Sequence, residues 1–490
     1  MVLEDRWSTT NEGTSSRIFS PDNFSRTLIV GTQMVGDAII LTGLSFISLW
    51  SALYPINITL QLGILYTLMT ACTTIFVISR FVNYGVYDIF TEPKLIMIVN
   101  TTIKGLLKAI LLLTAFLFVF KISDSVSRLW LATWSITSGI GLFGFRMLTA
   151  IVANRLRETG RLTKNVAIVA AGEVGHQLAA KLAREHHGTR LVGIFDERQS
   201  RFIKSSVGAP AVRQLPALYE LLCRGCVDEV VIAIPPYASL RILELSGRFQ
   251  PFPVSLRVLA PDGYENFRVL DSCRYGNIGT FRVMDKPLDE VAILVKRVED
   301  VVIAAFCLAF LLPLMLVIAL IVKLDSRGPV LFRQKRLGAN NLPFDLLKFR
   351  SMFVEQTDPL GHQLTCAGDP RITRVGRFLR RTSMDELPQL INVLRGEMSL
   401  VGPRPHPLAA NAAGIAYARA ISDYPIRHRV KPGITGWAQV NGWRGETTTI
   451  EQIRRRVEHD LYYIENWSLA FDLLILGRTV LAVLSRANAV

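Results

Sequence analysis

The stretch DPRITRVGRFLRRTSMDELPQLINVLRGEMSLVGPRP, residues 369–405, combines arginine, glycine and proline with one pair of adjacent carboxylates, Asp385 and Glu386. Arginine side chains bind phosphate through paired hydrogen bonds, and glycine lets the backbone come close to it. The stretch therefore predicts a site for a phosphorylated substrate. Three further segments extend the pattern: residues 325–338 (DSRGPVLFRQKRLG), 347–352 (LKFRSM) and 429–442 (RVKPGITGWAQVNG).

Pro388 places the carboxylate pair on a helix. Proline lacks a backbone N–H, so a helix tolerates it only in the first turn. The helix that contains residues 390–394 should therefore begin near Met384 or Asp385. At a helix N-terminus the unpaired N–H groups and the helix dipole favour an anion. An aspartate there stays ionised and can attack phosphorus, and an adjacent glutamate can hold a hard cation such as Mg²⁺.

A plain helix start fits the same residues. Ser383 and Glu386 have the spacing of a capping box, in which each side chain bonds the backbone N–H of the other residue. The carboxylate pair alone leaves both interpretations open.

An apolar run, residues 301–322, precedes this region and is long enough to cross a bilayer. Basic residues flank both ends: Lys296, Arg297, Lys323, Arg327, Arg333, Lys335 and Arg336. Because positive charge favours the cytoplasmic face, both flanks are expected there. Pro313 removes a helix hydrogen bond and clashes with the preceding turn. We expect a re-entrant membrane helix, residues 296–323, broken at Leu312–Pro313; a fifth span with a proline kink is the alternative.

The front of the chain predicts a four-helix transmembrane domain over residues 28–153. Basic residues before the first apolar stretch and after the fourth favour cytoplasmic ends, so residues 1–27 are expected to be a cytoplasmic tail. Asp37 lies within the first stretch, and we expect it to lie near the interface or to pair with another span rather than to act in chemistry. The four stretches are residues 28–50, 59–79, 96–120 and 129–153.

Strands that alternate with helices over residues 163–286 predict a parallel, Rossmann-like sheet. In the register of the dinucleotide fingerprint G-x-G-x-x-G, the three positions are Ala170, Gly172 and Gly175, so the first glycine is missing. Asp196 lies at roughly the distance expected of a ribose-binding acid. The pattern leaves open nucleotide binding and a structural or regulatory role. The expected strands include residues 165–170, 191–195 and 229–234.

The amino-acid composition limits the classes of molecule that the chain is expected to bind. Half of the 490 residues are hydrophobic and the net charge is +15. Such a charge fits nucleic acid, anionic lipid or phosphorylated substrates. Nucleic acid is not expected, because the chain has no zinc-finger spacing, no RNP-type motif and no long basic run. Residues 467–487 are apolar but interrupted by Asp472 and Arg478, which predicts an amphipathic helix on the membrane surface.

Three motifs carry a resemblance to a known family: S-x-D-E-L-P-Q, V-G-P-R-P and K-P-G-I-T-G-W-A-Q-V-N-G. The chain resembles the polyprenyl-phosphate hexose-1-phosphate transferases, bacterial enzymes that start exopolysaccharide and O-antigen repeat units, and is most similar to undecaprenyl-phosphate glucose phosphotransferases. The resemblance covers nearly the whole chain. It implies a membrane α-helical and α/β protein: four transmembrane helices, a Rossmann-like middle domain and a re-entrant helix that leads into a mostly helical catalytic domain, residues 324–490.

The resemblance also implies roles. Asp385 matches the nucleophile that attacks the β-phosphorus of a UDP-sugar, forms a phospho-sugar aspartyl enzyme and releases UMP. Glu386 matches the carboxylate associated with Mg²⁺, and undecaprenyl phosphate then accepts the sugar phosphate. Four basic residues are implied to contact phosphate or to border the site: Arg380, Arg404, Lys348 and Arg350.

Two other classes of protein fit the sequence less well. Membrane nucleotide-sugar dehydratases and epimerases also join four spans to a Rossmann-like domain, but no tyrosine here has a lysine four residues later, as their catalytic pair requires. A membrane nucleotide sensor without transferase activity leaves the arginine-rich region without a purpose. The likeness favours glucose over galactose as the sugar and implies the bacterial inner membrane, with the catalytic domain on the cytoplasmic face. The sequence leaves open whether the chain forms a homo-oligomer.

Overall fold

The structure is a computed structural model. It describes residues 21–53, 60–88, 95–159, 162–170, 172–185, 188–197, 212–260, 272–275, 278–354, 369–407, 411–412, 415–416, 421, 423–443 and 449–484. Residues 1–20 of the predicted tail lie outside these ranges, and the first helix already begins at Pro21.

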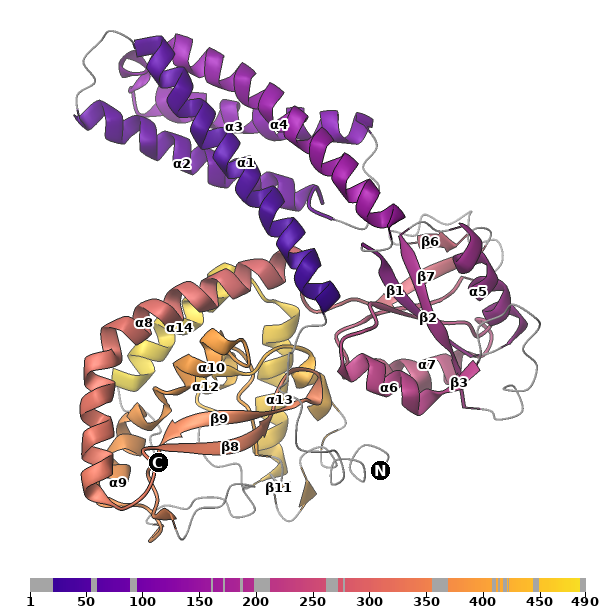
Figure 1. Cartoon of the computed structure of the whole chain (residues 1–490), viewed down its shortest axis with the longest axis vertical. Coiled ribbons are helices and arrows are strands. Elements are labelled where there is room, and N and C mark those ends of the chain that lie inside the picture. The colour runs from indigo at the N-terminus through magenta and orange to yellow at the C-terminus, as the bar shows by residue number, and fades with distance from the viewer. Residues whose placement is uncertain are drawn as a thin grey trace.

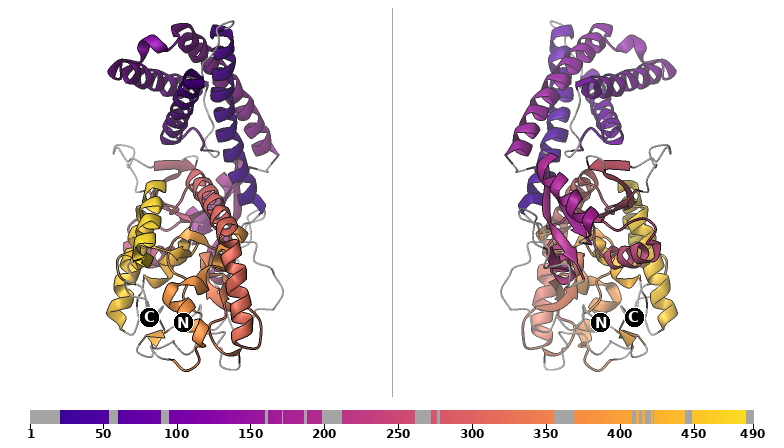
Figure 2. Two further views of the ribbon diagram at one scale, coloured as in Figure 1. Left: turned by 90° about the vertical axis from the view of Figure 1, so that its left-hand side faces the viewer. Right: turned by 90° about the vertical axis from the view of Figure 1, so that its right-hand side faces the viewer.

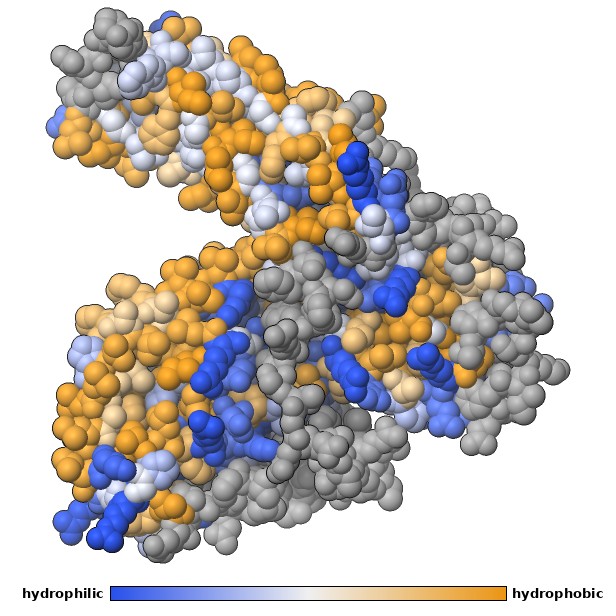
Figure 3. All heavy atoms as spheres, viewed as in Figure 1, coloured by the Kyte–Doolittle hydropathy of each residue, from blue (hydrophilic) through white to orange (hydrophobic). Residues whose placement is uncertain are grey.

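Four helices form an elongated bundle at one end of the molecule (Figures 1 and 2): α1 (Pro21–Leu53), α2 (Leu60–Asn83), α3 (Leu95–Val119) and α4 (Arg128–Glu158). All four contain stretches long and apolar enough to cross a membrane. Their outer faces expose large apolar side chains such as Ile75 and Phe118, which are 70% and 79% exposed. Figure 3 shows apolar side chains spread over this bundle. A surface of that kind is unfavourable in water and suits a lipid environment.

Asp37 is buried inside the bundle, with only 1% of its surface exposed. Its carboxylate forms an ion pair with Arg146 of α4 at 2.9 Å and accepts a hydrogen bond from the Tyr87 hydroxyl at 2.8 Å. The Arg146 guanidinium also lies over the Phe81 ring, 4.0 Å from its centroid. The expectation that Asp37 pairs with another span is confirmed.

A seven-stranded sheet follows the bundle, with strand order β3-β2-β1-β4-β5-β7-β6. The first five strands are parallel, as predicted, whereas β7 runs antiparallel to both β5 and β6. The antiparallel edge was not predicted, because its strands mix polar with apolar residues instead of forming a continuous apolar run. The strands are β1 (Lys164–Val169), β2 (Thr189–Asp196), β3 (Val212–Gln214), β4 (Glu229–Ile232), β5 (Ser255–Leu259), β6 (Ser272–Tyr275) and β7 (Ile278–Met284); the helices are α5 (Glu173–Glu185), α6 (Leu215–Cys223) and α7 (Ser239–Phe249).

The incomplete fingerprint lies where β1 leads into α5. Ala170 stands where the first glycine is missing and adopts a positive φ of 80°. A Cβ on Gly175 would lie 2.3 Å from the Ala170 carbonyl oxygen, so only glycine allows this close approach of helix and strand.

Helix α8 (Glu290–Asp325) is a single 36-residue helix that contains Pro313. The prediction that the helix is broken at Leu312–Pro313 is wrong, because the helix runs through both residues without interruption. Figure 1 instead shows α8 bending as it passes along one side of the unit that follows. A proline within a helix commonly produces such a bend. The helix is also long and apolar enough to span a membrane, so re-entry stays a prediction.

Cysteine labelling in intact cells tests whether α8 re-enters. Single cysteines placed beside Lys296 and beside Arg327 are expected to react from the same, cytoplasmic face, because basic residues flank both ends of the apolar run. A cysteine in the connection between α1 and α2 serves as the control for the opposite face. Labelling of the two α8 flanks from opposite faces would contradict re-entry.

The described part of the unit after α8 is mostly helical and contains three small strand pairs, one of them the short antiparallel pair of β11 and β12. β8 (Leu331–Leu337) and β9 (Pro343–Phe349) form an antiparallel hairpin, and β10 (Ser399–Val401) pairs in parallel with β13 (Gly433–Thr435). The core includes Phe344, Leu390 and Val393, and it packs against Ala304 of α8. The other elements are η4 (Ala339–Asn341), α9 (Arg374–Thr382), η6 (Met384–Glu386), α10 (Gln389–Arg395), β11 (Asn411–Ala412), β12 (Ile415–Ala416), η7 (Tyr424–Arg429), α12 (Trp437–Val440), α13 (Ile450–Glu465) and α14 (Leu469–Leu484).

Helix α14 turns its one acidic side chain inward. Asp472 is fully buried and accepts hydrogen bonds from Lys296 of α8 at 2.6 Å and from Tyr463 at 2.8 Å. Leu473 and Val480 on the same helix are exposed. Ile475 of the same helix is fully buried in the core, so α14 carries apolar side chains on both faces, and its place on the membrane surface stays a prediction.

The bundle, the sheet and α8 meet at Asp228, just before β4. Its carboxylate forms ion pairs with Arg26 of α1 at 2.6 Å and with Lys286, in the segment before α8, at 3.0 Å. It also accepts a hydrogen bond from the backbone N–H of Asn165 at 2.8 Å. Arg26 and Asp228 are both 3% exposed. These contacts lower the pKa of Asp228 against the opposing effect of burial.

Candidate active site

The carboxylate pair lies in η6, a short turn between α9 and α10. Helix α9 ends at Thr382, and the next residue, Ser383, has a φ of 59° in the left-handed region, which turns the chain away from the helix. Asp385 and Glu386 follow at once, and α10 begins only at Gln389. The predicted helix start near Met384 is therefore wrong for the α-helix, because a 3₁₀ turn intervenes. The Ser383 side chain makes no capping hydrogen bond, so the capping-box alternative is not formed.

Lys348 and Arg404 converge on Glu386 from two different elements. The Lys348 ammonium, on β9, lies 3.1 Å from a Glu386 carboxylate oxygen and 4.0 Å from Asp385. Arg404 follows β10 and forms an ion pair with Glu386. The structure therefore brings together two predicted phosphate-binding residues and both predicted carboxylates.

Arg380 and Arg350 have different surroundings. Arg380 of α9 donates to the Ser351 hydroxyl at 2.8 Å, and its charge acts on Asp385. Arg350 is 3% exposed and donates to the carbonyl oxygens of Ser326 at 2.6 Å and Arg327 at 3.0 Å, just after α8. These contacts hold Arg350 against the end of α8, and its predicted role at the border of the substrate site stays a prediction.

Asp385 is buried, and burial raises the pKa of its carboxyl group. The positive charge of Lys348 lowers that pKa, the negative charge of Glu386 raises it, and Arg380 and Arg404 lower it. The net direction is upward, so the protein's own cations do not fully offset burial and the neighbouring carboxylate. Additional positive charge arriving with a substrate would favour the ionised form.

Glycines in two motifs let β10 and β13 approach each other. A Cβ on Gly402 would lie 2.6 Å from the Lys431 carbonyl oxygen, and a Cβ on Gly433 would lie 2.1 Å from the Gly402 nitrogen. A Cβ on Gly436 would lie 2.3 Å from the Gly402 carbonyl oxygen. The sequence pattern had assigned such glycines to a close approach of backbone and phosphate. These three instead allow close backbone packing beneath the loop that carries Arg404.

Sequence reasoning missed a buried group that holds this loop. Arg427 of η7 is 1% exposed, donates to the Arg404 carbonyl oxygen at 2.8 Å and forms an ion pair with Asp460 of α13 at 2.7 Å. It also contacts His406, whose pKa is lowered well below its usual value by burial and by neighbouring arginines. Arg336 of β8 donates to the Pro405 carbonyl oxygen at 2.7 Å. The basic run beginning at Arg427 was the available signal, but its partners are distant in sequence.

The residues of this site fit a magnesium ion only if most of its ligands come from elsewhere. Within the described residues, no group of three or more histidine, cysteine, aspartate or glutamate side chains gathers as a metal cage. Mg²⁺ commonly binds through one or two carboxylates together with substrate phosphates and waters. Asp385 and Glu386 provide adjacent carboxylates of that kind. Burial raises the pKa of Asp385, so a nearby cation would stabilise its ionised form.

Comparison with known proteins places this site inside a family match. The sequence pattern of the bacterial sugar transferase family matches residues 291–486, and that of a CoA-binding domain family matches residues 83–260. The chain is 41% identical over 360 residues to a UDP-glucose:undecaprenyl-phosphate glucose-1-phosphate transferase of Escherichia coli (strain K12), covering 73% of this chain and 75% of that protein.

Two further relatives carry the same name. The one from Xanthomonas campestris pv. campestris is 32% identical over 499 residues, covering 100% of both chains. The one from Caulobacter vibrioides (strain ATCC 19089 / CIP 103742 / CB 15) is 52% identical over 283 residues, covering 58% of this chain and 98% of that protein. The similarity thus extends beyond the site to the bundle and the sheet.

Proposed function

Because this chain belongs to the bacterial sugar transferase family and is a phosphoglycosyl transferase, we propose that it transfers glucose-1-phosphate from UDP-glucose to undecaprenyl phosphate. The observation that carries the proposal is the Asp385–Glu386 pair held against Lys348 and Arg404, within the region that matches the family. The names of the three relatives support glucose as the sugar. The proposed role is the first transfer in building an exopolysaccharide repeat unit.

The first step of the proposed reaction forms a covalent enzyme. A carboxylate oxygen of Asp385 attacks the β-phosphorus of UDP-glucose, and the bond from that phosphorus to the bridging oxygen breaks. The electron pair stays on the oxygen that departs with UMP. A carboxylate is a weak nucleophile, so activation must come from positive charge on the diphosphate. We propose that Arg380 and Arg404 supply it, supported by the position of Arg404 against Glu386 and by the charge of Arg380 acting on Asp385.

The second step transfers the sugar phosphate to the lipid. An oxygen of undecaprenyl phosphate attacks the same phosphorus, and the bond to Asp385 breaks, which restores the free carboxylate. The product is a lipid diphosphate sugar. Since α8 and α14 both expose apolar side chains next to the site's unit, they are suited to hold this unit against the bilayer that contains the acceptor. We place the site on the cytoplasmic face of the bacterial inner membrane.

Glu386 is proposed to hold a magnesium ion that enters with the substrate. When bound, the ion would neutralise charge on the diphosphate and on the departing UMP. Lys348 and Arg404 fix the Glu386 side chain, so its position is set before substrate arrives.

Glu386→Gln is expected to raise the magnesium concentration needed for half-maximal activity by roughly tenfold, because a neutral amide is a poorer ligand for a hard cation. A magnesium titration of purified enzyme measures this. Glu451→Gln, an exposed position on α13, is the matched control and should titrate like the wild type. A Glu386→Gln enzyme that loses activity but keeps the same magnesium requirement would contradict the assignment.

A product assay with the full chain tests the proposed function. Membrane-reconstituted protein is incubated with undecaprenyl phosphate and with UDP-glucose or UDP-galactose in parallel, and the lipid product and UMP are measured. We expect product from UDP-glucose. Product from UDP-galactose alone would show that the transferred sugar is galactose and not glucose. Absence of lipid-linked product from both UDP-sugars would overturn the proposal.

A further inference from the structure

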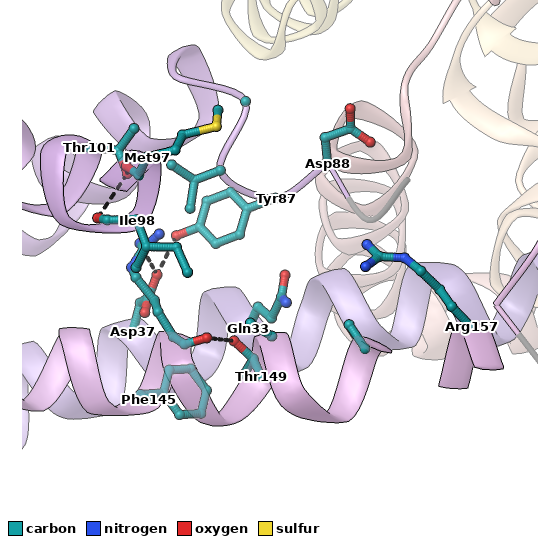
Figure 4. A pocket seen from close by; sticks show the side chains of 15 residues that line it. Gln33, Asp37, Tyr87, Asp88, Met97, Ile98, Thr101, Phe145, Thr149 and Arg157 are labelled. Atoms are coloured by element: carbon teal, nitrogen blue, oxygen red, sulfur yellow. Dashed lines mark hydrogen bonds and ion pairs between the residues drawn. The ribbon is translucent and has the colours of Figure 1, made fainter. Parts of the chain in front are cut away.

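A cavity of about 70 Å³ lies inside the membrane bundle, away from every motif used above. It is bounded by α1, α3, α4 and the connection that follows α2. Figure 4 shows Asp37 and Tyr87 on one side of it, Arg157 and Asp88 on the other, and Gln33 of α1 between them. One water needs only about 10–15 Å³ by this kind of measure, so the cavity has room for more than a single water.

The cavity presents unpaired hydrogen-bond acceptors. Asp37 uses one carboxylate oxygen for Arg146 and Tyr87, while its other oxygen and the Gln33 amide oxygen are buried with no hydrogen-bond partner among the described residues. The Thr101 and Thr149 hydroxyls donate to carbonyls of their own helices, which leaves their oxygen lone pairs for other donors. Burying an unpaired acceptor is costly. A ligand that fits this cavity should therefore donate N–H or O–H hydrogen bonds to these acceptors.

The cavity lies near the expected level of the lipid headgroups. Asp37 stands 16 residues before the end of α1 at Leu53, which is about 24 Å along a helix. A hydrocarbon core is about 30 Å thick, so Asp37 is near the boundary opposite to Leu53. At the outer end of the cavity, Arg157 lies against the sheet unit: a Cβ on Gly188 would be 3.6 Å from the Arg157 side chain. The cavity thus spans the transition from the apolar bundle to the polar unit.

We propose that this cavity binds one phospholipid headgroup that carries N–H or O–H donors beside its phosphate. The donors meet Asp37 and Gln33, and the phosphate lies toward the positive charge of Arg157. Met97, Ile98 and Phe145 line the same cavity and offer apolar contact to the adjoining acyl chain. Phosphatidylethanolamine, with its ammonium group, and phosphatidylglycerol, with its hydroxyls, both have this chemistry, whereas phosphatidylcholine has no such donor. An ionised polyprenyl phosphate has none either.

Native mass spectrometry of the full-length protein in detergent tests the proposal. The protein is titrated separately with phosphatidylethanolamine, phosphatidylglycerol and phosphatidylcholine of identical acyl chains. We expect one phosphatidylethanolamine or phosphatidylglycerol to bind about tenfold more tightly than phosphatidylcholine, which corresponds to the loss of roughly one hydrogen bond. Tighter binding of phosphatidylethanolamine would identify its ammonium group as the hydrogen-bond donor, and tighter binding of phosphatidylglycerol would identify its hydroxyls.

Gln33→Leu removes one unpaired acceptor at nearly constant size. It should weaken the preference for that lipid over phosphatidylcholine, because only the Asp37 carboxylate oxygen is then left to accept the lipid's hydrogen bonds. Gln61→Leu is the matched control, since Gln61 is exposed on α2 and does not line the cavity, and it should keep the preference.

Equal binding of the three lipids, an unchanged preference in Gln33→Leu, or a cavity that retains only water would each overturn the proposal. Tight binding of undecaprenyl phosphate that is insensitive to Gln33→Leu would also overturn it, since recognition would then rest on phosphate alone. If Gln33→Leu does not fold, the wild-type preference between the lipids decides the question. None of these outcomes depends on the transferase activity proposed above.

Discussion

Asp385→Asn is expected to lose at least about 10³-fold in turnover, because the substitution removes the charged oxygen that attacks phosphorus. Arg404→Lys should lose only about 10²-fold, the scale of one charge-stabilising donor in a transition state. Steady-state rates of UMP release in the presence of undecaprenyl phosphate measure both. Asp345→Asn is the matched control, since Asp345 is an exposed carboxylate on β9, the strand that carries Lys348, and its rate should equal that of the wild type.

Trapping the intermediate separates nucleophilic attack from other roles of Asp385. Enzyme incubated with UDP-glucose labelled in the sugar, without lipid acceptor, should become labelled and release one UMP per labelled site. Asp385→Asn should remain unlabelled. If UMP appears only when undecaprenyl phosphate is added, and no labelled enzyme can be trapped, direct transfer is the better account and Asp385 would act as a base or metal ligand.

Asp460→Ala is expected to destabilise the catalytic unit by about 3–5 kcal/mol, the usual cost of leaving a buried charge without its partner. The stranded group is Arg427, which is 1% exposed and pairs with Asp460 at 2.7 Å. Thermal unfolding followed in detergent measures the change. Glu458→Ala on the exposed face of the same helix should shift stability by no more than about 0.5 kcal/mol.

A double variant distinguishes a stranded charge from a general loss of packing. Arg427→Met combined with Asp460→Leu removes both charges and should recover a large part of the lost stability, as replacement of buried ion pairs by apolar groups often does. The turnover of the double variant should be lower than that of the wild type. The reason is that the Arg404 carbonyl oxygen loses its hydrogen bond from Arg427, which is 2.8 Å long. Equal stability of Asp460→Ala and Glu458→Ala would show that the pair carries little energy.

The sequence predicted those parts of the site whose chemistry is local. Asp385, Glu386, Lys348 and Arg404 were found from short motifs, and the fold brings them within contact distance. Arg350 shares a motif with Lys348, yet its guanidinium serves the end of α8. A motif shows that both residues belong to one region, but it does not say which way each side chain points along the strand.

Contacts between distant residues were beyond sequence reasoning. The pairs Asp37–Arg146 and Arg427–Asp460 join residues far apart in the chain, and no local pattern marks them. The start of α10 was misplaced because a proline is tolerated both in a first helical turn and just before it, and only the left-handed Ser383 decides between them. Alternation predicted the parallel strands but gave no sign of the antiparallel edge formed by β6 and β7.

The ion pair between Arg26 and Asp228 has a consequence for biosynthesis. The two residues are separated by 202 positions, so Arg26 leaves the ribosome well before its partner is made. At ordinary synthesis rates of about 5–20 residues per second, that interval lasts about 10–40 s. During that interval Arg26, near the start of α1, has no Asp228 carboxylate to pair with, and water or lipid phosphates can solvate its charge. The ion pair can therefore form only after β4 and the residue before it have been synthesised, long after α1 has left the ribosome.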